Sequence, residues 1–101
     1  MEIIHANQEN FNETINGKTV ILDFYATWCG PCKMLSAVIE ELASDRADGT
    51  IVKIDVDESE ELAKQYGVMS VPTLVMLEDG KEIKKNIGFM SKQELIDWIE
   101  K

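Results

Sequence analysis

Residues Thr19–Ala26, TVILDFYA, form a nearly continuous apolar run of β-branched and aromatic residues. Such a run predicts a β-strand, because these residue types pack well on a pleated surface. Apolar side chains fall on both faces of this strand, so other elements have to cover both faces. We therefore expect a sheet that is enclosed by helices.

Four segments carry the apolar spacing of an amphipathic helix. The longest extends from about Pro31 to the mid-forties, with apolar residues at i, i+3, i+4 and i+7, namely Leu35, Val38, Ile39 and Leu42. Pro31 suits its first turn, where a backbone N–H would have no partner in the helix. A short helix is expected around Phe11 and Ile15, and it ends at Gly17. A second is expected around Leu62 and Tyr66 and ends at Gly67. The last follows the capping box Ser91–Glu94 and carries Leu95, Ile96 and Ile99.

Further strand patterns lie between these helices. Thr50–Val56 has the pattern of a second buried strand, and Ile3–Ile4 begin a short one. Pro72–Glu78 and Lys81–Gly88 flank an Asp-Gly pair, which predicts a β-hairpin. The predicted order is β-α-β-α-β-α-β-β-α, whose alternating part needs parallel crossovers while the hairpin adds antiparallel strands. We expect one α/β domain over residues 1–101, a three-layer α/β/α sandwich around a mixed five-stranded sheet.

The charge of the chain limits its partners. The net charge is −9, from 19 acidic residues against 10 lysines and arginines. This balance opposes binding to nucleic acid or to an anionic membrane surface, which both recruit clusters of Lys and Arg. No apolar run approaches the roughly 20 residues that span a bilayer. The N-terminus starts with Met1 and lacks the basic and apolar regions of a signal peptide, so we expect a cytoplasmic protein, in which a permanent disulfide is unusual.

The two cysteines, Cys29 and Cys32, are separated by two residues in the segment TWCGPCK. A structural zinc site needs four ligands, and the chain adds only one histidine, His5, far from the motif in sequence. A site completed by carboxylates is a weaker alternative. A c-type haem site needs histidine directly after the second cysteine, where this chain has Lys33. A structural disulfide that closes so short a loop would stabilise the fold weakly and would be labile.

A redox pair is the interpretation of these cysteines that comes with a mechanism. Cys29 precedes the predicted helix, where unpaired N–H groups and the positive end of the helix dipole favour an anion. These groups stabilise the thiolate, which is the form that attacks disulfides. Cys32 lies one turn along and is placed to attack Cys29 in a mixed disulfide. The pattern thus predicts thiol–disulfide exchange.

The segment FYATWCGPCKM, with Asp23 before it and the tripeptide VPT after it, resembles the thioredoxin family, and the resemblance covers essentially the whole chain. It implies the thioredoxin fold and a protein-disulfide reductase that cycles between a Cys29–Cys32 dithiol and disulfide. It also implies a monomer that binds no cofactor or metal, reduces disulfide-containing client proteins and is re-reduced by thioredoxin reductase with NADPH. The sequence has no glycine-rich nucleotide-binding motif.

Two charged residues lie in the predicted central strands. Asp23 interrupts an apolar strand, where an unpaired carboxylate is costly and burial raises its pKa; an Asp at a sheet edge that reaches water is the alternative. By the resemblance, Asp23 is the buried acid that takes the proton of Cys32. Lys53 matches a family lysine near that acid, or else is a strand lysine whose ammonium reaches solvent.

The resemblance assigns further residues to client binding. Val71 and Pro72 match a pair with a cis bond that faces the cysteines, although the residues alone predict an ordinary trans bond at a strand start. Gly88 matches a glycine at the rim of the same surface, or is a flexible connector. Trp28 follows a strand, where an aromatic residue commonly belongs to the core. It would instead form a flat, uncharged, apolar rim that admits many client segments, together with Gly30, Pro31, Val71, Pro72, Gly88 and Phe89.

Some positions depart from the family pattern. Tyr25 stands where many members have tryptophan, and Ala37 replaces a proline that kinks the long helix, which is then expected to lose no backbone bond. Ser70 and Phe89 replace smaller residues and bear on partner preference. The run 55–61, DVDESEE, carries five acids in seven residues beside the expected client surface. It is either a solvated helix start or a feature that disfavours acidic partners.

Three other functions share part of the pattern. A binding module would use the thioredoxin surface without redox turnover, but both cysteines and Asp23 argue against it. An oxidising or isomerising relative of a secretory compartment is opposed by the missing signal peptide and by Gly30 and Pro31, because the residues between the cysteines tune the redox potential in this family. A glutaredoxin usually has an aromatic residue there. We therefore expect a cytoplasmic protein-disulfide reductase.

Overall fold

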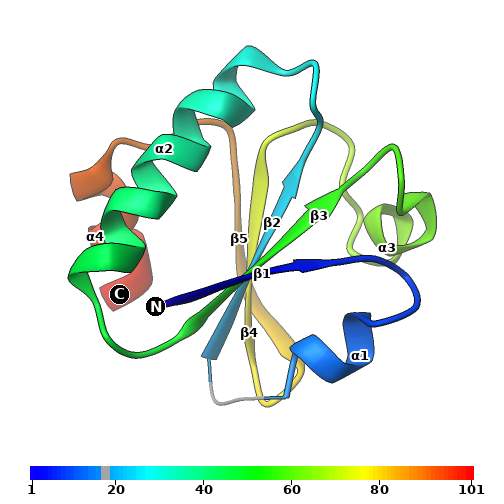
Figure 1. Ribbon diagram of the computed structural model, residues 1–101, viewed down its shortest axis with the longest axis horizontal. Coiled ribbons are helices and arrows are strands. Elements are labelled where there is room, and N and C mark those ends of the chain that lie inside the picture. Colours follow the sequence, from blue (N-terminus) through cyan, green and yellow to red (C-terminus); the bar gives the residue numbers. More distant parts are fainter. Residues whose placement is uncertain (17–18) are drawn as a thin grey trace.

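The computed structural model describes residues 1–16 and 19–101, and Figure 1 shows its helices and strands. The elements are β1 (Glu2–Ala6), α1 (Phe11–Thr14), β2 (Thr19–Tyr25), α2 (Gly30–Asp45), β3 (Thr50–Asp55), α3 (Glu60–Gln65), β4 (Thr73–Glu78), β5 (Lys81–Ile87) and α4 (Lys92–Glu100). This is the order predicted from the sequence, and the helix expected from about Pro31 begins one residue earlier. The stop expected at Gly17 lies outside the described residues.

The five strands form one mixed sheet in the order β1-β3-β2-β4-β5. β3 pairs in parallel with both β1 and β2, and β4 runs antiparallel to β2 and β5. The apolar run from which β2 was predicted therefore occupies the middle of the sheet. A strand in this position needs apolar residues on both faces, which explains why its sequence does not alternate.

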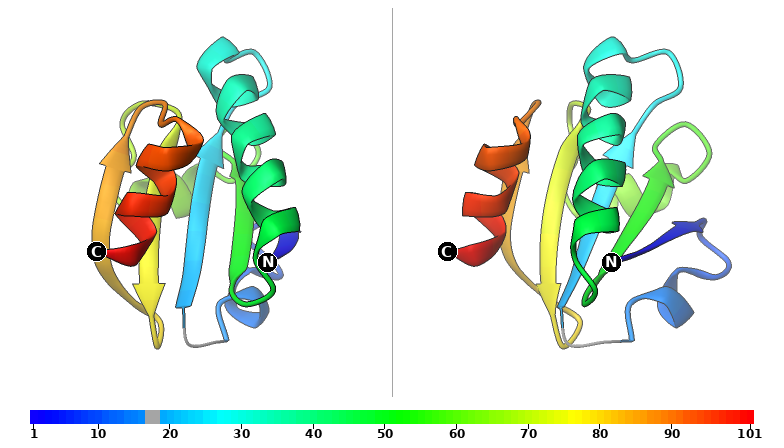
Figure 2. Two further views of the ribbon diagram at one scale, coloured as in Figure 1. Left: turned by 90° about the vertical axis from the view of Figure 1, so that its left-hand side faces the viewer. Right: turned by 60° about the vertical axis from the view of Figure 1, so that its left-hand side comes forward.

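Helices cover both faces of the sheet. In Figure 2, α2 and α4 lie on the same side of the sheet, and they pack against each other. Their apolar residues, including Leu35, Ile39 and Leu95, form one buried core with the strands. Phe11 of α1 and Leu62 of α3 belong to a second core on the opposite face. The predicted three-layer sandwich is confirmed.

The alternation of side chains along the strands decides what faces α2. In β2, Leu22 and Phe24 belong to the core under α1 and α3, whereas Ile21 belongs to the core under α2 and α4. Successive side chains point to opposite faces of a sheet, so Asp23 faces the α2 side. Lys53 is its partner in the parallel register of β3 and faces the same way.

The long helix α2 follows a short loop, residues 26–29, after the end of β2. It runs for 16 residues without a break at Ala37, as the missing proline predicts. Within the part of the chain that the structure describes, no helix has the length and apolar character needed to cross a bilayer.

Two local signals from the sequence have the predicted geometry. The Ser91 hydroxyl accepts from the backbone N–H of Glu94, whose carboxylate accepts from the N–H of Ser91, so the capping box of α4 is confirmed. The hairpin between β4 and β5 turns at Asp79 and Gly80, with φ angles of 52° and 81°. Two consecutive positive φ angles are typical of the tight turns that join antiparallel strands.

Candidate active site

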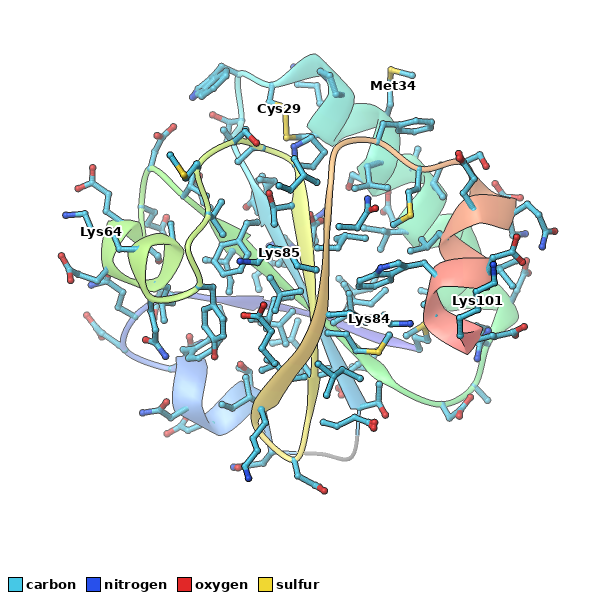
Figure 3. All side chains as sticks on the ribbon, turned by 180° about the vertical axis from the view of Figure 1, so that it is seen from behind. Cys29, Met34, Lys64, Lys84, Lys85 and Lys101 are labelled. Carbon is cyan, nitrogen blue, oxygen red and sulfur yellow. A yellow bond between two sulfur atoms is a disulfide. The ribbon has the colours of Figure 1, made fainter. Side chains whose placement is uncertain are left out.

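Cys29 and Cys32 form a disulfide at the start of α2, with 5.2 Å between their Cα atoms. Figure 3 shows Cys29 and its sulfur where the helix begins, near the exposed side chain of Met34. Both cysteines are nearly buried, at 5% and 4% exposure. Neighbouring groups therefore cover most of both cysteines, and little of either residue is open to a client.

Cys29 occupies the N-cap position of α2. Its Sγ accepts a hydrogen bond from the backbone N–H of Cys32 at 3.1 Å. The unpaired N–H groups of a first helical turn and the helix dipole stabilise negative charge at this position. This arrangement can support negative charge on the Cys29 sulfur when the disulfide is opened.

The loop before β4 lies against the same sulfur. The peptide bond between Val71 and Pro72 is cis, whereas the residues taken alone predicted a trans bond. The carbonyl oxygen of Val71 lies 3.8 Å from Cys29 Sγ. Gly88 donates its N–H to the carbonyl of Pro72 at 2.8 Å and has a φ of 100°, a conformation that favours glycine. Val71 thus lies beside Cys29, and Gly88 is hydrogen-bonded to the residue that follows Val71.

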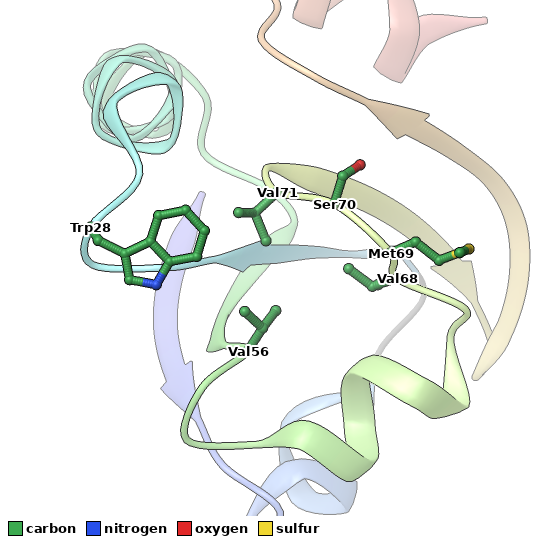
Figure 4. Close-up of a pocket in the computed structure, with 6 residues that line it drawn as sticks. All are labelled: Trp28, Val56, Val68, Met69, Ser70 and Val71. Carbon is green, nitrogen blue, oxygen red and sulfur yellow. The ribbon is translucent and has the colours of Figure 1, made fainter.

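Trp28 lies on the surface and is 70% exposed, so it does not belong to the core. Figure 4 shows it at the wall of a pocket of about 410 Å³ that is lined by Trp28, Val56, Val68, Met69, Ser70 and Val71. The indole N–H of Trp28 donates to a carboxylate oxygen of Asp57 at 2.8 Å. Asp57 belongs to the acidic run 55–61 that was expected beside this surface, and it brings a carboxylate to the edge of the rim.

The sequence reasoning missed part of this apolar surface. Met69 is 97% exposed and lines the pocket with Val56 and Val68. These residues carry no motif, and exposed methionine cannot be told from core methionine by residue type. The sequence feature that could have placed Met69 at this surface is its position two residues before Val71 and Pro72. Phe89, which was considered, is 42% exposed.

Asp23 and Lys53 form a buried ion pair under α2. The residues are 1% and 8% exposed, and the Lys53 ammonium lies 3.3 Å from Asp23 Oδ2. Asp23 therefore does not reach water from a sheet edge, and Lys53 does not extend into solvent. Burial raises the pKa of the Asp23 carboxyl, and the positive charge and hydrogen bond of Lys53 oppose that rise only in part. Within residues 1–16 and 19–101, the second oxygen, Oδ1, has no hydrogen-bond partner.

His5 is far from the cysteines in sequence but near them in space. It stands beside Lys53 in the register of β1 and β3, and it lines one pocket with Cys32. Across residues 1–16 and 19–101, no cluster of three or more His, Cys, Asp or Glu side chains has the arrangement of a metal site.

The comparison with protein-family models matches residues 2–101 to the family described as Thioredoxin. The chain belongs to the thioredoxin family. A thioredoxin from Chlamydia trachomatis serovar D is 47% identical over 94% of this chain and 93% of its own length. A thioredoxin from Bacillus subtilis strain 168 is 45% identical over 100% of this chain and 98% of its own. Among solved structures, a mutant thioredoxin from Halobacterium salinarum NRC-1 superimposes with a TM-score of 0.89 at 40% identity, covering 98% of this chain and 88% of that one.

Membership in the thioredoxin family decides the class of chemistry. Thioredoxins are protein-disulfide oxidoreductases that work without a bound cofactor, and their standard electron donor is thioredoxin reductase. This chain is a thiol–disulfide oxidoreductase whose redox pair is Cys29 and Cys32. The thioredoxin fold and the family resemblance predicted from the sequence are confirmed.

Proposed function

We propose that this thioredoxin reduces client disulfides with Cys29 as the nucleophile and Cys32 as the resolving thiol. The observation that carries the assignment is the N–H of Cys32, which points at Cys29 Sγ at 3.1 Å from within the first turn of a 16-residue helix. Cys32 Sγ has no such position, because Cys32 already lies inside the helix. The backbone thus supports negative charge on one sulfur of the pair.

The reaction has two exchange steps. In the first, the Cys29 thiolate attacks a client disulfide, forms a mixed disulfide and releases one client sulfur as a thiolate. In the second, Cys32 loses its proton to Asp23 and attacks Cys29 Sγ. The Cys29–Cys32 disulfide forms, the second client sulfur leaves, and two electrons have moved to the client. Asp23 suits the proton transfer, because burial raises its pKa toward the working pH.

Client binding is assigned to the surface around Cys29. The Val71 carbonyl lies 3.8 Å from Cys29 Sγ and precedes β4, so the backbone at Val71 and Pro72 lies beside the sulfur that a client has to reach. Trp28 supplies an exposed apolar face, and Gly88 leaves its side of the rim open. An extended client segment paired with Val71 would place its sulfur on Cys29 with little side-chain selection. We assign Gly30 and Pro31, which lie between the two cysteines, the role of tuning the redox potential of the cysteine pair.

The remaining assignments complete the proposal. The electron donor is a thioredoxin reductase that uses NADPH, and the clients are proteins with accessible disulfides. We place the protein in the cytoplasm, as a monomer made of one thioredoxin domain over residues 1–101. The net charge of −9 opposes nucleic acid and anionic membranes as partners.

The direct test couples the chain to a thioredoxin reductase, NADPH and insulin. NADPH oxidation that depends on insulin, with precipitation of the reduced insulin chains, is the expected result for a reductase. Cys29→Ser is the matched control and should abolish both signals. A binding module without redox turnover would give neither signal with the unaltered chain, and that outcome would overturn the proposal.

The acidic run beside Trp28 predicts a preference among clients. Glu58 and Glu60 are exposed and continue the charge that Asp57 brings to the rim. We expect disulfide peptides flanked by Lys or Arg to be reduced faster than peptides flanked by Asp or Glu. The double variant Glu58→Gln with Glu60→Gln should reduce the ratio of the two reduction rates by about two- to fivefold, which is the size of effect that exposed charge pairs produce.

The control for this preference is a second double variant that removes two negative charges elsewhere and so has the same net charge as the first. Glu9→Gln with Glu13→Gln alters α1 and the segment before it, at the opposite end of the molecule from the start of α2 in Figure 1. This pair should leave the ratio of rates unchanged, and 0.5 M salt should reduce the ratio in the unaltered chain. Equal effects of the two double variants would show that net charge, not the acidic run, sets the preference.

A further inference from the structure

The ammonium of Lys53 is held from three sides. It lies 3.3 Å from Asp23 Oδ2 and 5.2 Å from the centre of the Tyr25 ring, and it donates to the Ser36 hydroxyl oxygen at 2.7 Å. Ser36 belongs to α2 and follows Cys32 by four residues, so the two side chains lie on one face of the helix. The shortest polar contact of Lys53 is therefore with the helix that carries the cysteines.

Cys32, Ser36 and Lys53 line one pocket of about 350 Å³. The Asp23 carboxylate lies behind Lys53 and faces the same side of the sheet. A pocket of this volume, whose lining includes the polar side chains of His5, Ser36 and Lys53, can admit several water molecules. The Lys53 ammonium thus lies between the pocket that Cys32 lines and the buried carboxylate that it contacts.

We propose that Ser36 is a positioning residue: its hydroxyl holds the Lys53 ammonium against the Asp23 carboxylate and so keeps Asp23 ready to take the proton of Cys32. The inference rests on the proposed role of Asp23. The proton leaves Cys32 Sγ and binds an Asp23 oxygen, and the Cys32 thiolate then attacks Cys29. No further reactant is needed.

The physical reason lies in the Lys53 side chain. Its four-carbon stem loses rotamer entropy when the ammonium is fixed. The pocket that Lys53 lines leaves room for an alternative position of the ammonium. The bond to Ser36 opposes that movement, because hydrogen bonds to charged groups are stronger than neutral ones. If Lys53 turns toward the pocket, Asp23 keeps its burial but loses its cation, and its pKa rises further. Asp23 would then be protonated when Cys32 needs a base.

Other charged or titratable groups face this pair and have to be separated from the effect. From the elements packed around it they are His5 on β1, Tyr25 on β2, and Cys32 and Lys33 on α2. From β4, the residue in register with Asp23 is the apolar Leu74. Histidine side chains change charge near neutrality. The pH titration of Asp23 is therefore repeated in a His5→Gln background, where the effect of Ser36→Ala on the Asp23 midpoint should persist.

The test follows the carboxyl carbon of Asp23 by NMR in the reduced protein while the pH is varied. Ser36→Ala should raise the pH midpoint of the Asp23 titration by about 0.5–1 pH unit. At pH values below the midpoint, this shift corresponds to a roughly three- to tenfold slower second exchange step, in which the client is released. Ser36→Thr keeps the hydroxyl and should restore the original midpoint. Ser44→Ala is the matched control: it removes a hydroxyl from the exposed end of the same helix, where it bonds Glu41, and should change neither quantity.

A double variant distinguishes the possible outcomes. In a Lys53→Met background, Ser36→Ala should shift the Asp23 midpoint no further, because the two changes remove one interaction. An unchanged midpoint in Ser36→Ala, or a shift that persists without Lys53, would overturn the proposal. If Ser36→Ala moves the midpoint while Asp23→Asn leaves the release rate and its pH dependence unaltered, the positioning of Lys53 holds and the proton-transfer role of Asp23 fails.

Discussion

Cys32→Ser is expected to accumulate covalent complexes with client proteins, and Cys29→Ser is expected to form none. In Cys32→Ser the Cys29 thiolate still attacks a client disulfide, but the sulfur that would release the client is missing. The mixed disulfide then persists until an external thiol cleaves it. In Cys29→Ser the sulfur that is left lies inside α2, away from the N-cap position that supports a thiolate.

The measurement incubates each variant with a model disulfide protein and separates the products on a non-reducing gel. Near-complete trapping by Cys32→Ser at equimolar client, abolished by dithiothreitol, is the expected result. A variant lacking both cysteines controls for non-covalent complexes. Equal trapping by the two single variants would show that the N-cap position does not select the nucleophile, and the assigned roles would be lost.

Asp23→Asn is expected to make the folded protein more stable at pH 7 and slower in client release. The folded state buries a carboxylate, one oxygen of which has no hydrogen-bond partner among the described residues. Such a group costs about 1–3 kcal/mol, or more when it is charged. The amide carries no charge and therefore lacks the part of this cost that comes from burying a charge. Loss of the carboxylate deprives Lys53 of an ion-pair partner, but its ammonium retains Ser36 and can reach the pocket. We therefore expect a net gain of stability, with the melting temperature raised by roughly 4–8 °C per kcal/mol.

The stability gain expected for Asp23→Asn should increase with pH. Burial raises the pKa of Asp23, so between its ordinary pKa and the raised one the folded protein holds a proton that the unfolded chain releases. The stability contributed by this group is thus lost as the pH rises through that window. The advantage of Asp23→Asn should be small below the ordinary pKa of aspartate, should grow through the window and should level off above it. Chemical denaturation of both reduced proteins at several pH values measures it.

The same variant tests the second exchange step. Asp23→Asn should slow the decay of a preformed mixed disulfide at pH 7, with less effect at high pH, where Cys32 loses its proton to solvent. The far-ultraviolet circular dichroism of the variant is the control for its fold. Unchanged release at pH 7 would refute the acid–base role, and a lower stability than that of the unaltered chain would show that the pair with Lys53 outweighs the burial of Asp23.

The order of the elements could be predicted because local patterns control it. The apolar run 19–26 marked the central strand, the spacing in 35–42 marked α2, and the Asp79-Gly80 pair marked the hairpin. Each signal comes from residues within one element and depends on the period of a helix or a strand. The bond between Val71 and Pro72 is different, since the residues alone favour trans, and its cis form was expected only through the family resemblance.

The surroundings of the cysteines were predicted less completely. The acidic run 55–61 was expected beside the client surface, but the bond between the Trp28 indole and Asp57 was missed. The two residues are 29 apart, and no pattern links an indole to a carboxylate at that separation. The contact of Ser36 with Lys53 was missed for the same reason. A half-buried serine in a helix has no distinctive spacing, and its role depends on which strand residue lies beneath it.

The sequence by itself determined the layers of this thioredoxin and the pairing of Cys29 with Cys32, because helical and strand periods and a two-residue spacing are local properties of the chain. Only the tertiary structure decided the environment of that pair. The Val71 carbonyl reaches Cys29 across 42 residues, and Asp23, Lys53 and Ser36 meet from β2, β3 and α2. Such contacts follow from the register of the sheet and from the crossover that places α2 over it, which bring together residues that no local period connects.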